Sequence, residues 1–395
     1  MVRKRRLSPK SVWDEADLKA AFQEAGIKES HIRRLYRHLV THPEATWHDV
    51  PDLPKAACAL LDKDFVRSTS VVEKAQTSSD GSTCKLLVRL QDGMQVEAVV
   101  MTYEKEGGGD EESEDGHAVL GQQRSTLCVS SQVGCQMGCT FCATGTMGLK
   151  GDLTAGEIVE QLLHAQRVTR IKNVVFMGMG EPLNNYEAVR SATSMMIDPA
   201  LFSLRRSKVT ISTVGIVPRI LQLVEDLPGV SLALSLHAPN QELRQSIVPS
   251  ARAYKLDKLM AAIDTYREKT GQKIFVEYVM LNRVNDAPET AHELGQLLRG
   301  KNMILNLIPW NPVYSPDISF DAPGAERVAA FQRIVREEYG VFCTVRQEMG
   351  QDISGACGQL VVEQGGAGCG GQVAGKAADI EELGKRAANL TTAVA

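Results

Sequence analysis

The N-terminal part of the chain has the pattern of amphipathic helices. Within residues 12–41, apolar side chains recur three or four positions apart in two separate stretches, which is the spacing of one helix face. The two predicted faces consist of Leu18, Ala21 and Phe22, and of Ile32, Leu35, Tyr36 and Leu39. A further short helix is predicted over residues 53–62. We therefore interpret residues 1–80 as a small helical module.

The pattern changes to strands after this module. Residues 85–90 and 95–101 are rich in strand-forming side chains and flank Asp92-Gly93, a pair typical of hairpin turns. They predict a β-hairpin within residues 81–104. Residues 105–116 are acidic and glycine-rich with no apolar face, so we expect a flexible loop over residues 105–121. The glycine-rich residues 363–395 are predicted to form a flexible tail with one short helix near 377–388.

Residues 122–362 alternate between short β-branched runs and helical patterns. Strands are predicted at 126–130, 173–177, 208–213, 231–236, 274–281 and 303–308, and helices at 154–168, 186–197, 216–225, 255–269, 287–299 and 323–339. Such alternation predicts a parallel sheet covered by helices. Six units are fewer than the eight that close a full barrel. The predicted fold class is therefore α/β, a partial (β/α)6 barrel that follows the helical module and the hairpin.

Charge and composition restrict the classes of partner. The formal net charge of the 395 residues is −4, so binding to a nucleic acid would need local basic patches. Residues 3–6 form one candidate patch, and Arg33, Arg34 and Arg37 form another.

The cysteines and the hydropathy pattern bear on location. Nine cysteines in a chain of this length do not resemble a secreted disulfide framework, so we expect a reducing compartment and predict a cytoplasmic protein, with an organellar location left open. No apolar run approaches the roughly 20 residues of a membrane span, and no secretory signal precedes the first helical pattern.

Three cysteines lie within one short segment after the first predicted strand of the barrel. Cys135, Cys139 and Cys142 form a C-x3-C-x2-C pattern. A ferredoxin-type cluster needs four cysteines, because every iron must be capped, and a structural zinc site would also need a fourth ligand. Three thiolates therefore predict a [4Fe–4S] cluster with one open iron, which binds S-adenosylmethionine (SAM) through its amino and carboxylate groups.

Further polar residues follow the later predicted strands. Residues 178–182 (Gly-Met-Gly-Glu-Pro) close the second strand, and Glu181 could accept a hydrogen bond from the ammonium of SAM. The other polar residues at strand ends are Ser212, Ser235, His237 and Asn311. Because strand ends of a β/α barrel collect at one edge, these side chains are candidates for ligand contacts.

Two more cysteines have distinctive settings. Cys128 lies seven residues before the first cluster cysteine, and Cys357 lies in a loop of small residues after the last strand. Small neighbours leave a thiol accessible, and an accessible thiolate is a nucleophile. Cys357 is therefore a candidate nucleophile, although the sequence by itself does not connect it with Cys128.

Together, several ordered motifs resemble the RlmN/Cfr family of radical SAM RNA methyltransferases. The resemblance covers residues 12–362 and rests on segments 128–135, 141–145, 178–184, 235–239, 307–312 and 352–360. It implies a partial (β/α)6 barrel with an N-terminal RNA-binding module. It also implies two SAM molecules per turnover, an RNA substrate (ribosomal or transfer RNA), a monomeric enzyme, and an electron donor such as a flavodoxin or ferredoxin.

The resemblance also implies roles for individual residues. Cys357 takes a methyl group from one SAM, and a second SAM gives a 5′-deoxyadenosyl radical that converts the methyl into a methylene radical. This carbon adds to C2 of an adenine, and Cys128 releases the adduct by forming a disulfide with Cys357. Glu97 is the implied proton acceptor. The implied SAM contacts are Gly180, Glu181, Ser212, Ser235, Leu236, His237 and Asn311.

Three alternatives remain at this stage. Methylation at C8 of adenine uses the same cysteines, so the motifs do not separate it from methylation at C2. A radical SAM enzyme acting on protein or small molecules is a second alternative, which the pair Cys128 and Cys357 disfavours. A non-enzymatic iron–sulfur or RNA-binding protein is a third, which the segment 178–182 disfavours.

Overall fold

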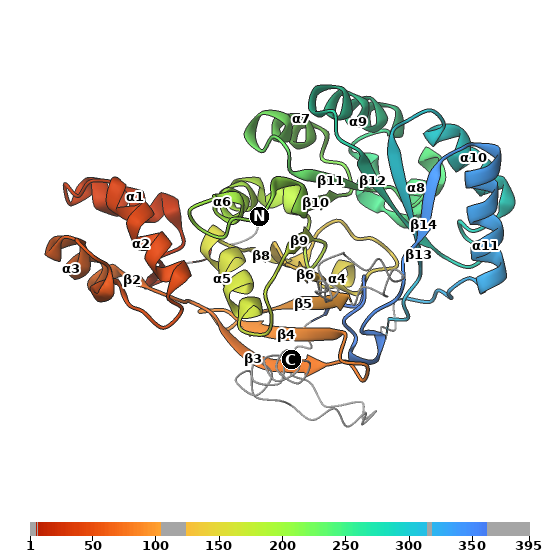
Figure 1. Cartoon of the computed structure of the whole chain (residues 1–395). Coiled ribbons are helices and arrows are strands. Elements are labelled where there is room, and N and C mark those ends of the chain that lie inside the picture. Colours follow the sequence, from red (N-terminus) through yellow and green to blue (C-terminus); the bar gives the residue numbers. More distant parts are fainter. Residues whose placement is uncertain (1–4, 6, 104–123, 314–317, 362–395) are drawn as a thin grey trace, which may run out of the picture.

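The computed structural model describes residues 5, 7–103, 124–313 and 318–361. The predicted acidic loop, tail and tail helix lie outside the described residues, as do three members of the basic patch at residues 3–6. The central feature is a sheet of ten strands, in the order β14-β13-β12-β11-β10-β9-β6-β5-β4-β3 (Figure 1). Since β14 and β3 form its two edges, the barrel is open, and the predicted α/β fold class is confirmed.

Seven of the described strands run parallel and form the barrel wall. They are β6 (Arg124–Cys128), β9 (Asn173–Phe176), β10 (Val209–Thr213), β11 (Ser231–Ser235), β12 (Ile274–Met280), β13 (Met303–Pro309) and β14 (Phe342–Val345). Antiparallel pairing then continues the sheet through β5 (Gln95–Tyr103), β4 (Thr83–Arg89) and β3 (Val71–Thr77). The predicted hairpin is thus part of the same sheet as the barrel.

Helices cover the outside of the parallel strands (Figure 1). They are α5 (Ala155–Gln166), α6 (Tyr186–Ile197), α7 (Val217–Asp226), α8 (Gln241–Ile247), α9 (Leu256–Thr270), α10 (Pro288–Leu298) and α11 (Ala325–Arg333), which continues into a π-helical turn, Ile334–Glu338. A short ribbon of β7 (Gln132–Cys135) and β8 (Gly148–Asp152) flanks α4 (Ala143–Thr146). Short 3-10 turns lie at Trp47–Asp49, Pro182–Asn185, Arg206–Lys208, Pro249–Arg252 and Gln351–Ile353. Within the described residues, no helix is long and apolar enough to cross a bilayer.

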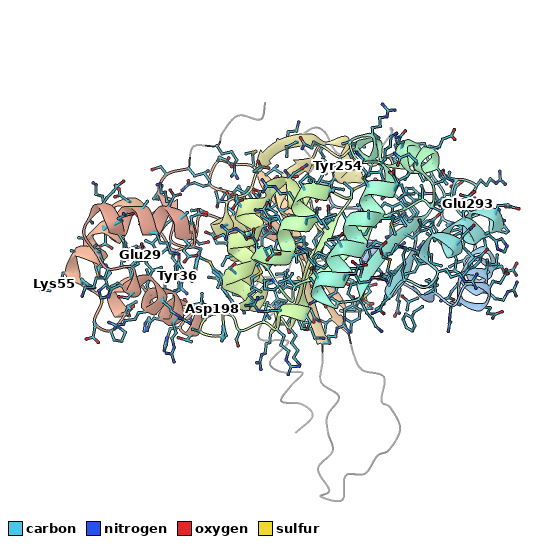
Figure 2. All side chains as sticks on the ribbon, turned by 90° about the horizontal axis from the view of Figure 1, so that it is seen from above. Glu29, Tyr36, Lys55, Asp198, Tyr254 and Glu293 are labelled. Atoms are coloured by element: carbon cyan, nitrogen blue, oxygen red, sulfur yellow. The ribbon has the colours of Figure 1, made fainter. Side chains whose placement is uncertain are left out.

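The N-terminal helices form a group at one end of the molecule (Figures 1 and 2). They are α1 (Glu15–Glu24), α2 (Ser30–Thr41) and α3 (Lys55–Asp64), with β1 (Lys10–Ser11) pairing with β2 (Phe65–Val66). Trp13 is fully buried and stacks on Tyr36 at 5.3 Å between ring centroids. Its ring also lies against that of Phe202 of the barrel domain, with 6.4 Å between the ring centroids. The apolar residues of this group belong to the same continuous core as those of the barrel.

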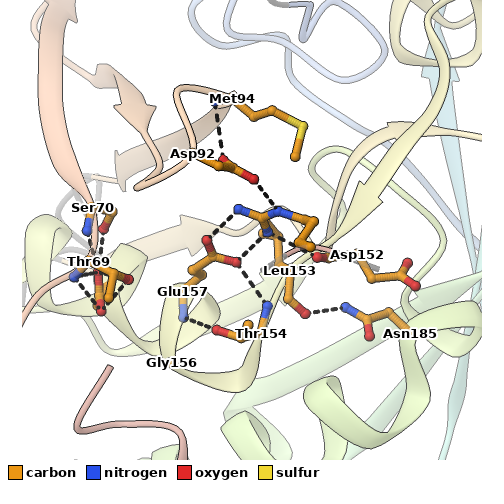
Figure 3. A network of polar contacts seen from close by, with 12 residues as sticks. Thr69, Ser70, Asp92, Met94, Asp152, Leu153, Thr154, Gly156, Glu157 and Asn185 are labelled. Carbon is orange, nitrogen blue, oxygen red and sulfur yellow. Dashed lines mark hydrogen bonds and ion pairs between the residues drawn. The ribbon is translucent and has the colours of Figure 1, made fainter. Parts of the chain in front are cut away.

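Buried polar contacts connect this N-terminal group and the antiparallel strands to α5 (Figure 3). Arg5 forms ion pairs with Asp92 at 2.6 Å and with Glu157 of α5 at 2.7 Å. One turn further along α5, the buried carboxylate of Glu160 accepts hydrogen bonds from Ser70 Oγ at 2.5 Å and Ser11 Oγ at 2.7 Å. Arg5 therefore has a structural role, which corrects the expectation that it belongs to a basic patch available to nucleic acid.

Several elements were not predicted. Strand β3 has mostly exposed side chains and lies at a sheet edge, so its sequence shows no apolar alternation. Strand β14 has four residues, and its first side chain, Phe342, is exposed. The helix predicted over residues 323–339 begins at Ala325 and changes to π-helical geometry at Ile334. The short α8 and the β7–β8 ribbon were missed because neither has a full period of apolar side chains.

Candidate functional site

Two adjoining cavities lie inside the barrel. The first, here called the cluster cavity, is lined by Cys135, Cys139 and Cys142 together with residues from the ends of β9–β13. The second, here called the thiol cavity, is lined by Cys128, Val99 and Met101 from the antiparallel side and by the loop that carries Cys357. The residues lining both cavities are Met177, Ile308, Asn311, Arg346 and Cys357.

The three motif cysteines are carried by the segment between β7 and α4. Cys135 ends β7, and Cys142 directly precedes the first residue of α4. The backbone of this loop is fixed to the barrel, because Thr140 N–H donates to Ile247 O at 3.0 Å and Trp310 Nε1–H donates to Phe141 O at 3.0 Å. All three cysteines line one wall of the cluster cavity, as the sequence predicts.

The chemistry of these thiols fits a cubane cluster. Among the described residues, no three His, Cys, Asp or Glu side chains converge on a single point as the ligands of one metal ion do. A cubane instead binds each cysteine at a separate corner, so its three thiols need not meet at one point. Burial raises the pKa of Cys135 to about 12 and also raises the pKa of Cys139 and Cys142. Thiolates in this setting need a compensating positive charge, which iron supplies.

A buried arginine that sequence reasoning missed lies beside the cluster cysteines. Arg244 of α8 is 1% exposed and donates to the carbonyls of Leu236, Ser235 and Val214, at the ends of β11 and β10. Burial lowers its pKa to about 10, and the charge of Cys139 opposes that shift. The short helix that carries this arginine left no clear pattern in the sequence.

The glycines of segment 178–182 have a packing role. A Cβ on Gly178 would lie 2.6 Å from Val129 O, and Gly180 has φ +102° with its Cβ position 2.6 Å from Gln132 Cβ. These glycines let the segment pack on β7 and on the connection that precedes it, and both also line the cluster cavity. The carboxylate of Glu181 lines the cluster cavity and accepts from Leu183 N–H and Val214 N–H, both at 2.9 Å. Burial raises the pKa of Glu181 to about 7.

All four predicted polar residues at strand ends, Ser212, Ser235, His237 and Asn311, line the cluster cavity. Ser212 and Ser235 come together, with their hydroxyl oxygens 3.3 Å apart. His237 has φ +61°, and its Nδ1 accepts from Val279 N–H at 3.1 Å, so the proton lies on Nε2. Burial, with the charge of Arg244, lowers the pKa of His237 to about 3 and keeps the ring neutral.

Leu236, which also follows β11, is fully buried in the main apolar core and is absent from the lining of the cluster cavity. Successive residues of an extended chain point to opposite faces, so the side chain of Leu236 is turned away from the cavity that Ser235, the last residue of β11, lines. Any contact between Leu236 and a ligand in that cavity would therefore come from its backbone.

The loop carrying Cys357 is fixed by contacts from several elements. Asn311 Nδ2–H donates to Cys357 O at 3.0 Å, and Asn311 Oδ1 accepts from Gln351 at 2.9 Å. The cluster segment also contacts this loop, because Ala143 N–H donates to Gly358 O at 2.8 Å. Asn311 lines both cavities, and its amide positions the Cys357 loop.

Cys128 and Glu97 lie on neighbouring strands. Cys128 of β6 pairs with Val99 of β5 and is 7% exposed, and burial raises the pKa of its thiol to about 12. Cys128 and Cys357 are free thiols that both line the thiol cavity. Glu97 forms an ion pair with Lys85 at 2.9 Å and accepts from Val361 N–H at 3.0 Å. Glu97 does not line either cavity, and its hydrogen bond with Val361 N–H holds the segment that follows Cys357.

Two charged residues of the cavity walls were not predicted. Glu277, on β12, is 4% exposed and lines the cluster cavity. Arg346 follows β14 and lines both cavities; the charge of Cys357 is the largest influence on its guanidinium and raises its pKa. A lone carboxylate in the apolar run at 274–281 was a sequence signal for Glu277. No comparable signal pointed to Arg346, because β14 was not recognised.

Comparisons with known proteins agree with this geometry. Residues 129–294 match the radical SAM superfamily. The chain is 42% identical over 323 residues to "Ribosomal RNA large subunit methyltransferase N" of Nitrosopumilus maritimus, covering 79% of this chain and 87% of that protein. It is 39% identical over 340 residues to "Dual-specificity RNA methyltransferase RlmN 1" of Myxococcus xanthus, covering 85% and 89%.

A solved structure is also similar. The crystal structure of a radical SAM methyltransferase from Sphaerobacter thermophilus has a TM-score of 0.78 and 37% identity, covering 89% of this chain and 99% of that one. A radical SAM enzyme uses a [4Fe–4S] cluster and SAM, and the three cysteines of the cluster cavity fit that requirement. The chain belongs to the RlmN/Cfr family of radical SAM RNA methyltransferases.

Proposed function

We propose that this enzyme methylates C2 of an adenine in ribosomal or transfer RNA through a methylated cysteine. The observation that carries this proposal is the placement of Cys357. Its side chain belongs to the walls of both cavities, whereas the cluster cysteines line only one cavity and Cys128 lines only the other. A residue at this boundary can take a carbon from SAM on one side and pass it to a base on the other.

Cys357 and Cys128 have different roles in this proposal. The Cys357 thiolate attacks the methyl group of SAM, forms a sulfur–carbon bond and leaves S-adenosylhomocysteine. When bound, the cluster supplies the electron that cleaves a second SAM to a 5′-deoxyadenosyl radical. The Cys357 methyl group then gives a hydrogen atom to this radical, and its carbon bonds to C2 of the adenine. The base radical loses its C2 proton and one electron, for which the oxidised cluster would be the acceptor. The Cys128 thiolate finally attacks the Cys357 sulfur: a disulfide forms, the sulfur–carbon bond breaks, and the released carbon takes up a proton to become the methyl group of the base.

The remaining predicted residues have supporting roles in the proposal. Glu97 accepts a proton from the modified base; the hydrogen bond of its carboxylate with Val361 N–H, four residues beyond Cys357, supports this role. Glu181, Ser212, Ser235, His237 and Asn311 contact SAM, as do the backbones of Gly180 and Leu236. This set is supported by the cluster cavity, whose walls contain all of these residues except Leu236. The α1–α3 group binds RNA, and an external electron donor such as a flavodoxin or ferredoxin reduces the cluster.

Mass spectrometry of nucleosides tests this proposal. Ribosomal and transfer RNA fractions should be digested from cells with and without this gene. We expect 2-methyladenosine in one or both fractions to depend on the gene and to return when the gene is restored. Gene-dependent 8-methyladenosine would instead identify the enzyme as a C8 methyltransferase, and loss of neither nucleoside would contradict an adenine product.

A further inference from the structure

A row of polar side chains follows five neighbouring strands of the barrel, and three of its members line the cluster cavity. It consists of Ser212 on β10, Ser235 on β11, Glu277 on β12, Asn306 on β13 and Thr344 on β14. The strand register pairs Ser235 with Glu277, Glu277 with Asn306, and Asn306 with Thr344. The row therefore runs from the predicted SAM contacts to the edge of the sheet.

Hydrogen bonds join the members of this row at each end. Thr344 Oγ1–H donates to Asn306 Oδ1 at 2.6 Å, and Asn306 Nδ2–H donates to Glu277 Oε1 at 2.9 Å. At the other end, the hydroxyls of Ser212 and Ser235 are 3.3 Å apart. The row is interrupted between Ser235 and Glu277.

The interruption leaves one carboxylate oxygen without a donor. Glu277 Oε2 is inaccessible to solvent and has no hydrogen-bond partner within the described residues. Arg346 acts on the Glu277 carboxyl through its charge but forms no ion pair with it in the described structure. An unsatisfied buried carboxylate oxygen is costly, and the side chain lines a ligand cavity. A ligand that donates a hydrogen bond to Oε2 explains why a carboxylate occupies this position.

We propose that Glu277 binds a ribose hydroxyl of SAM through Oε2, with Ser212 and Ser235 beside it. The ligand of this cavity offers three kinds of donor: the ammonium, the adenine amine and the two ribose hydroxyls. A vicinal diol both donates and accepts, so it complements a carboxylate next to two serine hydroxyls. Dinucleotide-binding folds read ribose with a carboxylate in the same way. This inference rests on the SAM site of the proposed function but not on its RNA product.

A chemical double-mutant cycle tests the contact without turnover. The ligands are S-adenosylhomocysteine and its 2′-deoxy and 3′-deoxy analogues, titrated calorimetrically into the cluster-reconstituted full chain. The variants are Glu277→Gln, which retains a neutral acceptor, and Glu277→Met, which removes it. Glu289→Gln, an exposed residue of α10, is the matched control.

We expect the wild type to lose roughly 10- to 100-fold in affinity when one of the two hydroxyls is removed, because the bond is charge-assisted. Glu277→Met should bind intact S-adenosylhomocysteine more weakly than the wild type by the same factor. Its affinity for the deoxy analogue that lacks the contacted hydroxyl should be only slightly lower again. Glu277→Gln should fall between the two, and Glu289→Gln should match the wild type. Such non-additivity is the signature of a direct contact.

Three results would overturn the inference. If the affinity lost by changing Glu277 and the affinity lost by removing either hydroxyl are additive, Glu277 does not contact the ribose. Coupling of Glu277 to the adenine amine, measured with a purine analogue that lacks it, would reassign the acceptor. Weakened binding of SAM but not of S-adenosylhomocysteine would mean that the carboxylate instead faces the sulfonium. Iron content and thermal unfolding separate these results from misfolding, and the Gln series alone suffices if the Met variant does not fold.

Discussion

Two buried carboxylates in this molecule have opposite hydrogen-bonding states. Glu160 of α5 accepts from the hydroxyls of Ser11 and of residues 68–70 and from the backbone N–H groups of residues 69 and 70, so both of its oxygens are satisfied. Glu277 of β12 has one satisfied oxygen and one without a partner in the described residues. A saturated polar cluster connects parts of the fold, whereas an incomplete one marks a place for a ligand.

Two arginines, Arg5 and Arg346, differ in the same way in how far their side chains are engaged by other residues. Arg5 is committed to Asp92 and Glu157, and its side chain is 8% exposed, so its charge is used within the protein. Arg346 lines both cavities, and within the described residues its guanidinium donates a hydrogen bond to Met177 Sδ at 3.8 Å. The ion pairs of Arg5 stabilise the contact of the N-terminal segment and the antiparallel strands with α5. The charge of Arg346, in the barrel, lies at the walls of the two cavities.

Removal of the cluster ligands is expected to have the largest effect. Anaerobically reconstituted wild-type protein should contain about four irons per chain, because a cubane is held by the three cysteines. Alanine at Cys135, Cys139 or Cys142 should reduce iron and the cluster absorption to background. Iron near the wild-type level in these variants would show that the wall of three thiols is not the cluster site. Cys84→Ala, at a buried cysteine outside both cavities, is the control.

The same substitution at the two carboxylates should have opposite effects on stability. Glu160→Gln directs an amide N–H₂ at groups that donate, so we expect a loss of about 1–3 kcal/mol in the free energy of unfolding. Glu277→Gln removes a buried charge with an unsatisfied oxygen, so stability should be unchanged or higher by up to about 1 kcal/mol. Urea unfolding of both variants measures this. A larger loss at Glu277 than at Glu160 would contradict the comparison.

A moderate effect is expected for RNA binding by α2. Arg33, Arg34 and Arg37 are exposed, and each phosphate contact that is lost should lower the salt slope of log K by roughly 0.7–0.9. The triple glutamine variant should therefore bind transfer RNA or ribosomal RNA fragments more weakly and with a smaller slope. The matched control changes three exposed basic residues of the barrel to glutamine: Lys258, Lys273 and Arg299. An unchanged slope in the α2 variant would locate the RNA surface elsewhere.

A pH dependence of stability is expected at the junction between the N-terminal group and α5. Burial raises the pKa of Asp14 to about 7, although its carboxylate accepts from Gly156 N–H at 2.7 Å. Between about pH 4 and pH 7 the folded state therefore holds a proton that the unfolded state has lost, so the contribution of Asp14 to stability decreases as pH rises. Asp14→Asn should remove this part of the decrease. Identical slopes of unfolding free energy against pH in wild type and variant would refute the shift.

Sequence patterns predicted the parts of the molecule that depend on local chemistry. The β/α alternation, the turn at Asp92-Gly93 and the three cysteines of the cluster cavity were all visible in the chain. The unsatisfied oxygen of Glu277 was not, because it depends on the side chains that adjoin it across strands. The structural role of Arg5 was missed for the same reason, since Glu157 lies 152 positions away in the sequence.

The most direct test of the two-thiol account compares Cys128→Ala with Cys357→Ala. Both variants should retain the cluster, because neither thiol belongs to the C-x3-C-x2-C motif. Cys128→Ala can form the bond to RNA but cannot release it, so denaturing gels should show a covalent protein–RNA species that ribonuclease collapses. Cys357→Ala lacks the carbon carrier and should give neither adduct nor methylated RNA. Normal turnover by Cys128→Ala, or an adduct formed by Cys357→Ala, would contradict the account.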